Sequence, residues 1–150
     1  MAHTPSENTQ ALATALVKGA RHSDIEHVNT RLCSPFDCDA KDVLNCDGII
    51  LFTTENFGYM SGALKDFFER IYYPCLDDPT RNEGKPFALV IRAGLDGTGT
   101  DIAVHKITTG LKWKEVQELT LCKGEFDKNF IQQCEQLGLT IAAGLDNDIF

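Results

Sequence analysis

The sequence lacks the features of membrane, exported and nucleic-acid-binding proteins. No apolar run approaches the roughly 18 residues that a membrane-spanning helix needs. The first residues also lack the basic and apolar regions of a secretory signal peptide, so we expect a cytoplasmic protein without a membrane partner. The 14 Lys and Arg against 22 Asp and Glu give a net charge of −8. Because binding to a phosphate backbone depends on clustered Lys and Arg, this charge argues against nucleic acid as a partner.

Motifs for catalysis or metal binding are also missing. The six cysteines form no C-x-x-C pair and match no zinc spacing, so we expect reduced thiols that pack as small hydrophobic side chains. A redox or metal role is the alternative. The sequence has no serine nucleophile elbow and no His-Glu-x-x-His, and we expect His22, His27 and His105 to be exposed. We therefore assign no catalytic side chain and no metal ligand.

What the sequence does contain is enough apolar residues for a core. At 43% hydrophobic, the chain predicts one folded domain over residues 1–150. Two continuous apolar runs, 48–52 and 87–91, are bounded by turn residues and predict parallel strands that are covered on both faces. Weaker strand candidates are 25–30 and 116–121.

Helical periodicity alternates with these strands. Apolar residues at helical spacing predict a helix that begins after an N-cap at Ser61 and ends at Pro74. Further helices are expected over 9–20, near 101–111 and from about Asp127. This alternation of strands and helices predicts an α/β sandwich around a parallel sheet, with right-handed crossovers.

Three polar loops stand where a parallel sheet binds ligands, beyond the carboxyl ends of its strands. Loop 4–9 opens the first helix, and its hydroxyl and N–H groups would either bind an anion or simply cap the helix. Loop 53–62 carries Phe57 and Tyr59, which would either contact a planar ring or cover the end of the sheet. Loop 93–100 has three glycines, which suit either close approach to a ligand or a flexible lead into a helix.

Together these loops resemble a known group of proteins. The stretch DGIILFTTENFGYMSGALKDFFER, residues 47–70, is similar to a strand, loop and helix of the NADPH-dependent FMN reductases and the multimeric-flavodoxin type of NAD(P)H:quinone oxidoreductase. Residues 85–90 resemble the next strand of that flavodoxin-like superfamily, and 4–9 resemble its phosphate loop. The resemblance implies a flavodoxin-like three-layer α/β/α sandwich with FMN as its cofactor.

The same resemblance implies which residues hold FMN. The expected contacts are Thr4, Ser6, Asn8 and Thr9 to the phosphate; Thr53, Thr54, Glu55, Asn56, Phe57 and Gly58 in the second loop; and Ala93, Gly94 and Gly97 in the third. Residues 55–58 would line one side of the isoalloxazine ring. Because the flavin carries the chemistry, no catalytic side chain is required.

The function implied is an FMN-dependent oxidoreductase that passes electrons from NAD(P)H to a quinone or similar small-molecule acceptor. Two alternatives stay open: a flavodoxin-type electron carrier between protein partners, and a protein of this fold that has lost FMN binding. Assembly into a homo-oligomer is also left open.

The sequence departs from the family pattern at several positions. Glu7 stands where the family has glycine and brings a carboxylate near the phosphate, Pro5 has no N–H to donate, and Thr54 replaces a proline. Only Met1–His3 precede the first loop, so no hydrophobic run is present for the first, central strand. We expect a natural start further upstream, a shortened chain, or a sheet that fills the gap in another way. An absent strand would leave open backbone edges, which favour loss of cofactor or association with a second chain.

Overall fold

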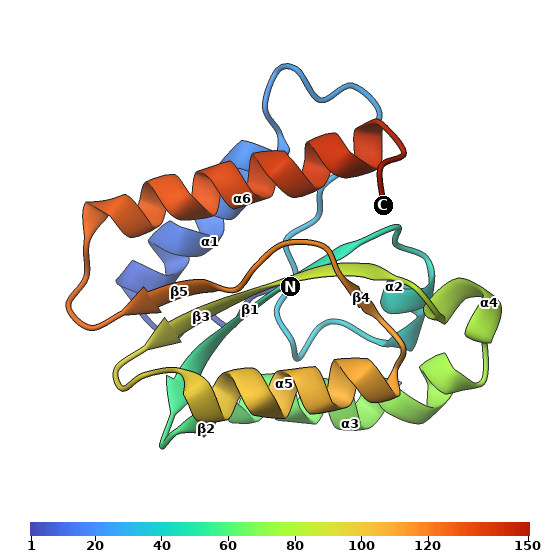
Figure 1. The fold of residues 1–150 in the computed structure, drawn as a ribbon, viewed down its shortest axis with the longest axis horizontal. Coiled ribbons are helices and arrows are strands. Elements are labelled where there is room, and N and C mark those ends of the chain that lie inside the picture. Colours follow the sequence, from blue (N-terminus) through green and yellow to red (C-terminus); the bar gives the residue numbers. More distant parts are fainter.

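The computed structural model describes all 150 residues, and helices cover both faces of a five-stranded sheet (Figure 1). The helices are α1 (Glu7–Ala20), α2 (Ala40–Leu44), α3 (Gly62–Leu76), α4 (Pro79–Asn82), α5 (Thr98–Gly110) and α6 (Lys128–Asp146). Helices α1 and α6 pack together on one face, and α3 and α5 cover the other. The predicted α/β/α sandwich is confirmed. None of these helices is both long and apolar enough to cross a membrane.

Four parallel strands and one short antiparallel strand make up the sheet. The strands are β1 (Ile49–Asn56), β2 (Tyr59–Met60), β3 (Pro86–Ala93), β4 (Lys114–Glu115) and β5 (Thr120–Lys123). Their order is β2-β1-β3-β4. Strand β5 also pairs with β3, further along it than β4 does: β4 lies opposite Pro86 and Phe87, and β5 lies opposite residues 90–93. The strands predicted over 48–52 and 87–91 are thus confirmed, whereas 116–121 shares only its last two residues with β5 and 25–30 forms no strand.

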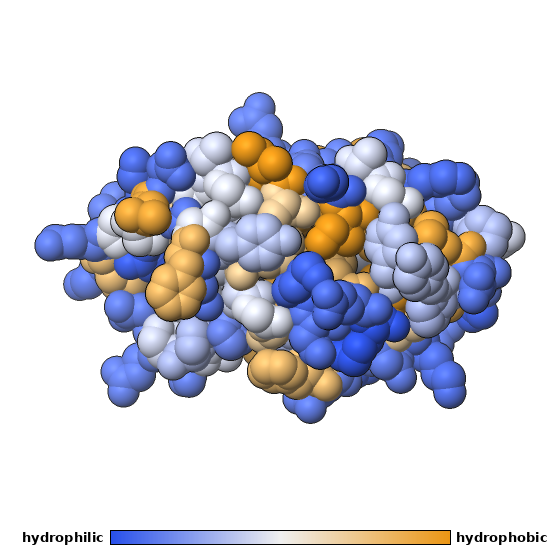
Figure 2. Space-filling view, turned by 90° about the horizontal axis from the view of Figure 1, so that it is seen from below, coloured by the Kyte–Doolittle hydropathy of each residue, from blue (hydrophilic) through white to orange (hydrophobic).

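Alternate residues of the central strands fill two separate cores. Leu51 of β1 and Leu89 of β3 belong to the larger core under α3 and α5, while Phe52 and Val90 belong to the core under α1 and α6. Because both faces are covered, every position of these strands favours an apolar residue, which explains their unbroken hydrophobic runs. The outer face of α3 and α5 is largely hydrophilic, with small hydrophobic groups along its middle (Figure 2).

Residues Met1–His3 lie beside β1, in the place expected for the first strand. The N–H of Phe52 donates to the Met1 carbonyl, and the N–H of His3 donates to the Phe52 carbonyl, each at 3.0 Å. On the other side, the N–H of Ala2 donates to the Cys33 carbonyl at 2.9 Å. These three residues therefore fill the gap beside residues 50–52 of β1. Residues 25–30 pair with no strand of the sheet, so the strand predicted there does not form.

Helix α3 does not end at Pro74, contrary to the prediction. It continues to Leu76, and the N–H of Asp77 donates to the Tyr73 carbonyl at 3.0 Å. Proline in the last turn removes only one backbone donor, and the next residue, Cys75, is fully buried in the larger core. Packing of this last turn therefore outweighs the cost of the proline.

His105 is half-buried, so the expectation that it is exposed and solvated is wrong. Its Nδ1 lies 2.9 Å from the Asp101 carbonyl oxygen and its Nε2 lies 3.0 Å from a carboxylate oxygen of Glu115. Burial alone lowers the pKa of His105, but the hydrogen bonds to Glu115 and Asp101 outweigh it and raise the pKa above its usual value. The His105 ring therefore joins α5 to β4.

This ion pair predicts a pH-dependent stability. Because the pKa of His105 is raised in the folded state, its stabilisation is fully present below about pH 6.5 and fades as the pH rises through the folded value. We expect His105→Gln to lower the free energy of unfolding in urea more at about pH 5.5 than at about pH 8.5. Glu115→Gln should remove the same pH dependence, and the double variant should add little to either. Equal losses at both pH values would contradict the ion pair.

Candidate functional site

Three loops leave neighbouring strands at the carboxyl edge of the sheet. Ala2 lies opposite Phe52, so the chain enters loop 4–9 next to the end of β1. Loop 53–62 spans the end of β1 and the hairpin to β2, and loop 93–100 follows β3, which pairs with β1. Helices α1, α3 and α5 begin at this edge (Figure 1). The topology therefore brings together the three predicted segments.

The second and third loops are joined by the side chain of Glu55. Its carboxylate accepts the N–H of Leu95 at 2.8 Å and the N–H of Gly97 at 3.1 Å. The backbones also touch, because a Cβ on Gly99 would lie 2.0 Å from the Gly58 carbonyl oxygen. Only glycine at position 99 permits this approach. The two loops therefore form one surface with little freedom to separate.

Phe57 has an unusual backbone at the tip of the β1–β2 hairpin. Phe57 and Gly58 form a two-residue turn with φ values of 55° and 72°. Glycine adopts this left-handed conformation freely, whereas a residue with a side chain pays roughly 1–2 kcal/mol for it. The Phe57 ring is fully exposed, at 107% of its reference area, so no packing compensates for the cost. Strain of this kind concentrates at functional sites.

The first loop caps α1 with its own hydroxyl groups. The N–H of Thr9 donates to Ser6 Oγ at 3.3 Å, and the N–H of Ser6 donates to Thr9 Oγ1 at 3.0 Å. These two residues thus form an ordinary capping box, and Thr9 is buried. The N–H groups of Glu7 and Asn8 donate to no protein atom, and both residues are exposed. They are the free donors that a helix N-terminus offers to an anion.

Charged groups at this edge are acidic. None of the three loops contains Lys or Arg, while Glu7 and Asp96 are exposed. Hydrogen bonds from the backbone and side chain of Thr98 lower the pKa of Asp96, which keeps its carboxylate ionised. An anion here would depend on N–H groups, hydroxyls and the dipole of α1 rather than on cationic side chains.

Two hydroxyl groups at this edge are buried without a partner. Thr54 Oγ1, at the end of β1, and Thr100 Oγ1, in the first turn of α5, make no hydrogen bond within the protein. Buried polar groups normally have a partner, so these two offer bonding capacity to a bound molecule. Thr54 was expected from the sequence. Thr100 and Gly99 were not, although the repeated glycines of loop 93–100 mark the place.

Other predicted residues have structural partners instead. Thr53 is fully buried, and its Oγ1 accepts the N–H of Ser61, the N-cap of α3, at 3.2 Å. Ala93 is fully buried, and its carbonyl accepts the N–H of Gly124 at 2.9 Å. Thr4 is half-buried, whereas Asn56 and Gly94 are exposed. Thr53 and Ala93 thus shape the loops, and the exposed residues form their surface.

Comparison with known families decides the classification. The family model for NADPH-dependent FMN reductase matches residues 4–126. The chain belongs to this family. Membership in the NADPH-dependent FMN reductase family confirms FMN as the cofactor, and with it a flavin-binding oxidoreductase or electron carrier. A comparison with curated proteins gives no match.

Solved structures show the same fold at low identity. A flavodoxin from the domain Archaea is 19% identical, with 96% of this chain and 94% of that chain covered and a TM-score of 0.77. Two-electron reduced flavodoxin from Megasphaera elsdenii is 17% identical, with coverage of 95% and 99% and a TM-score of 0.74. The flavodoxin, WrbA-like protein from Agrobacterium tumefaciens is 15% identical, with coverage of 98% and 94% and a TM-score of 0.73. The flavodoxin-like fold is therefore confirmed for this member of the NADPH-dependent FMN reductase family.

The donor set at the carboxyl edge fits FMN. The free N–H groups that start α1 suit a phosphate, the partnerless Thr54 hydroxyl suits a polar edge of a ligand, and the exposed Phe57 ring suits a planar ring system. The carboxylate of Glu7, in the first turn of α1, opposes a phosphate at that position.

The bridge made by Glu55 predicts slow exchange in the third loop. In Glu55→Ala, the amides of Leu95 and Gly97 lose their acceptor, so we expect their hydrogen exchange to accelerate by about tenfold or more, since a charge-assisted bond contributes ~1.5–3 kcal/mol. NMR-detected exchange measures this directly. Glu118→Ala, which removes an exposed acid with no hydrogen bond, is the matched control and should leave both amides unchanged. Unchanged exchange in Glu55→Ala would show that the loops are held together by other contacts.

Proposed function

We propose that this protein is an FMN-dependent oxidoreductase that takes electrons from NAD(P)H and passes them to a quinone or similar small acceptor. The observation that carries the proposal is Phe57, a fully exposed ring held on a strained backbone beside two other ligand-competent loops. The family match to NADPH-dependent FMN reductases supports a nicotinamide as electron donor.

In this proposal, the first loop binds the phosphate of FMN. The free N–H groups of Glu7 and Asn8 donate to the phosphate oxygens, and the dipole of α1 favours its charge. The side chains of Thr4 and Asn8 supply further donors. Ser6 and Thr9 hold the start of α1 in place through their capping box, so their role in binding the phosphate is mainly structural. Glu7 weakens this binding, which makes affinity for FMN sensitive to that residue.

The second and third loops bind the isoalloxazine ring. Phe57, Tyr59 and Leu95 are exposed apolar residues on these two loops, with exposures of 107%, 43% and 64%. A flat apolar ring that covers them removes this surface from water. The Glu55 carboxylate keeps the loops at a fixed separation, so the ring meets a preformed surface. Asn56, Gly58 and Gly94 supply backbone groups at its edge, and Thr54 supplies the partnerless hydroxyl. Gly97, which was also expected to contact FMN, is buried; its N–H donates to Glu55 and its carbonyl accepts the N–H of Asp101, so it shapes the loop instead.

The protein supplies position, and FMN supplies the chemistry. When bound, FMN would supply hydride and electron transfer between NAD(P)H and an acceptor, and the three loops would hold it in position. Phe57, Tyr59 and Leu95 are exposed to solvent, so a nicotinamide or a quinone can reach the surface that would hold the ring. No titratable side chain needs to change its protonation state in this scheme.

A second candidate is an electron carrier that docks to protein partners. The net charge of −8 favours it, because an acidic surface steers association with basic partners. A carrier binds FMN with the same residues but does not turn over NAD(P)H by itself.

Two measurements separate these functions. Purified protein should show flavin absorption bands and release FMN on heating, and the FMN-loaded protein should oxidise NADPH or NADH with a quinone faster than free FMN does. Turnover no faster than free FMN, with FMN bound, would overturn the reductase and leave the carrier. Failure to bind added FMN would overturn both.

Phe57 predicts opposite effects on stability and on ligand binding. Phe57→Gly removes the side chain that opposes a left-handed backbone, so we expect the free energy of unfolding of the FMN-free protein to rise by roughly 1 kcal/mol. The same change should weaken FMN binding by about tenfold, because a stacked aromatic ring contributes ~0.5–1.5 kcal/mol beyond its area.

Denaturant unfolding and titration with FMN measure the two effects. Tyr73→Ala, which removes an exposed ring from α3 away from the loops, is the control and should leave FMN affinity unchanged. FMN affinity that is equal in Phe57→Gly and the unaltered protein would exclude Phe57 from the flavin site.

A further inference from the structure

Two thiols lie together outside the three flavin loops, in the segment between α1 and α2. The sulfur atoms of Cys33 and Cys38 lie within 4.8 Å of each other and of a carboxylate oxygen of Asp42. Cys33 is half-buried, while Cys38 is buried against the larger core. The pair thus has one thiol that solvent can reach and one that is shielded.

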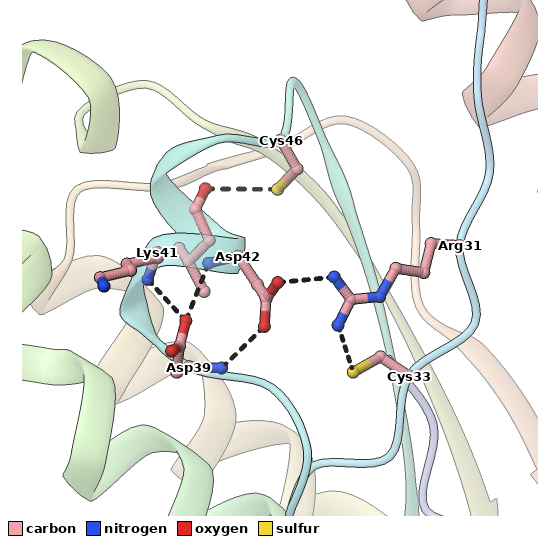
Figure 3. A network of polar contacts seen from close by, with 7 residues as sticks. Arg31, Cys33, Asp39, Lys41, Asp42 and Cys46 are labelled. Carbon is pink, nitrogen blue, oxygen red and sulfur yellow. Dashed lines mark hydrogen bonds and ion pairs between the residues drawn. The ribbon is translucent and has the colours of Figure 1, made fainter.

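The reachable thiol has a cationic neighbour. Arg31 extends between Asp42 and Cys33 (Figure 3). One guanidinium nitrogen donates to Cys33 Sγ at 3.3 Å, and the other donates to Asp42 Oδ1 at 2.6 Å. A guanidinium beside sulfur favours the thiolate, which is the reactive form of cysteine. The Arg31 side chain is 63% exposed, so a small reagent can approach along it.

The shielded thiol keeps its proton. Burial and the hydrogen bond to Cys33 raise the pKa of Cys38 to about 12. Cys38 therefore remains a neutral thiol at neutral pH.

The backbone between the two cysteines is held by α3. Arg70 donates to the Cys38 carbonyl at 2.7 Å and to the Pro35 carbonyl at 2.6 Å, while its Nε is paired with Asp66. Pro35 is buried. This short loop therefore holds the two cysteines on a fixed backbone with their sulfur atoms within 4.8 Å of each other.

We propose that Cys33 and Cys38 form a reversible disulfide when the protein meets a peroxide. The Cys33 thiolate attacks one oxygen of hydrogen peroxide, the O–O bond breaks, and Cys33 sulfenic acid and hydroxide result. The Cys38 thiol then attacks the Cys33 sulfur. The S–S bond forms, and the Cys38 proton leaves with the sulfenic hydroxyl as water. The two thiols lose two electrons, which reduce the peroxide, and a dithiol reagent reverses the change by exchange.

The same three groups could instead bind a metal ion, but their contacts disfavour it. Arg31 already binds Cys33 and Asp42, and the second oxygen of Asp42 accepts the N–H of Asp39 at 3.0 Å. A cation would have to displace a guanidinium and break the capping box of α2. The observations therefore favour the disulfide, and zinc binding is an outcome that the test must detect.

The test treats the reduced full-length protein with hydrogen peroxide and maps the products by mass spectrometry. Trypsin cuts after Arg31 and Lys41, so both thiols fall in one peptide, 32–41. We expect this peptide to become two hydrogens lighter, to lose both alkylation sites, and to regain them with dithiothreitol. In Cys38→Ser, oxidation should stop at a Cys33 sulfenic acid that dimedone traps.

Further variants isolate the role of Arg31. In the Cys38→Ser protein, added Arg31→Gln should slow dimedone labelling by about tenfold, since the thiolate loses its cation. Lys41→Gln removes a nearby exposed cation that does not contact Cys33, and it should not change the rate. Cys46 is an internal comparison, because it is also half-buried but its thiol donates to the Val43 carbonyl.

Three results would overturn the proposal. The first is oxidation of Cys46 before the Cys33–Cys38 pair. The second is equal labelling rates in the Arg31→Gln and Lys41→Gln variants. The third is stoichiometric binding of added zinc that protects Cys33 from alkylation, which would assign the cluster to a metal.

Discussion

Parallel pairing of β1 with β3, under helices on both faces, determines where the other parts of the molecule lie. Six consecutive residue pairs join the two strands, from Ile49 opposite Phe87 to Thr54 opposite Arg92. Each strand contributes side chains to both cores, so a shift of one residue would exchange the two sets of packing partners. Because this register is fixed, the second and third loops start at the same level, and Glu55 reaches the N–H groups of loop 93–100.

At the carboxyl edge, the bases of the loops are buried and rigid, whereas the tip of the second loop has an unfavourable backbone conformation. Thr53, Ser61 and Ala93 are buried and hydrogen-bonded, so they hold the loop bases in place. At the tip, Phe57 keeps an unfavourable backbone and an exposed ring. A protein under selection for stability alone would place glycine or asparagine there. The unfavourable backbone of Phe57 therefore supports the proposal that its ring contacts the ligand.

Features that depend on short segments could be predicted from the sequence. The apolar runs of β1 and β3, the N-cap at Ser61 and the start of α6 after Asp127 all follow from local patterns, and the structure confirms them. The predictions that failed concern residues whose structure depends on other elements of the chain. His105 is drawn into a half-buried ion pair by Glu115 on another element, and 25–30 lacks a neighbouring strand. Likewise, no local pattern shows that Glu55 would bind backbone groups 40 residues further along the chain.

Helix α3 joins the second loop at the carboxyl edge to the segment that carries the two thiols. Its first turn is capped by Ser61 in that loop, and Arg70, ~13 Å further along the axis at about 1.5 Å per residue, donates to two carbonyls of the segment that carries Cys33 and Cys38. The same helix therefore sets the position of the base of the second loop and of the backbone between the two thiols, so that a substitution that shifts α3 would disturb both places at once.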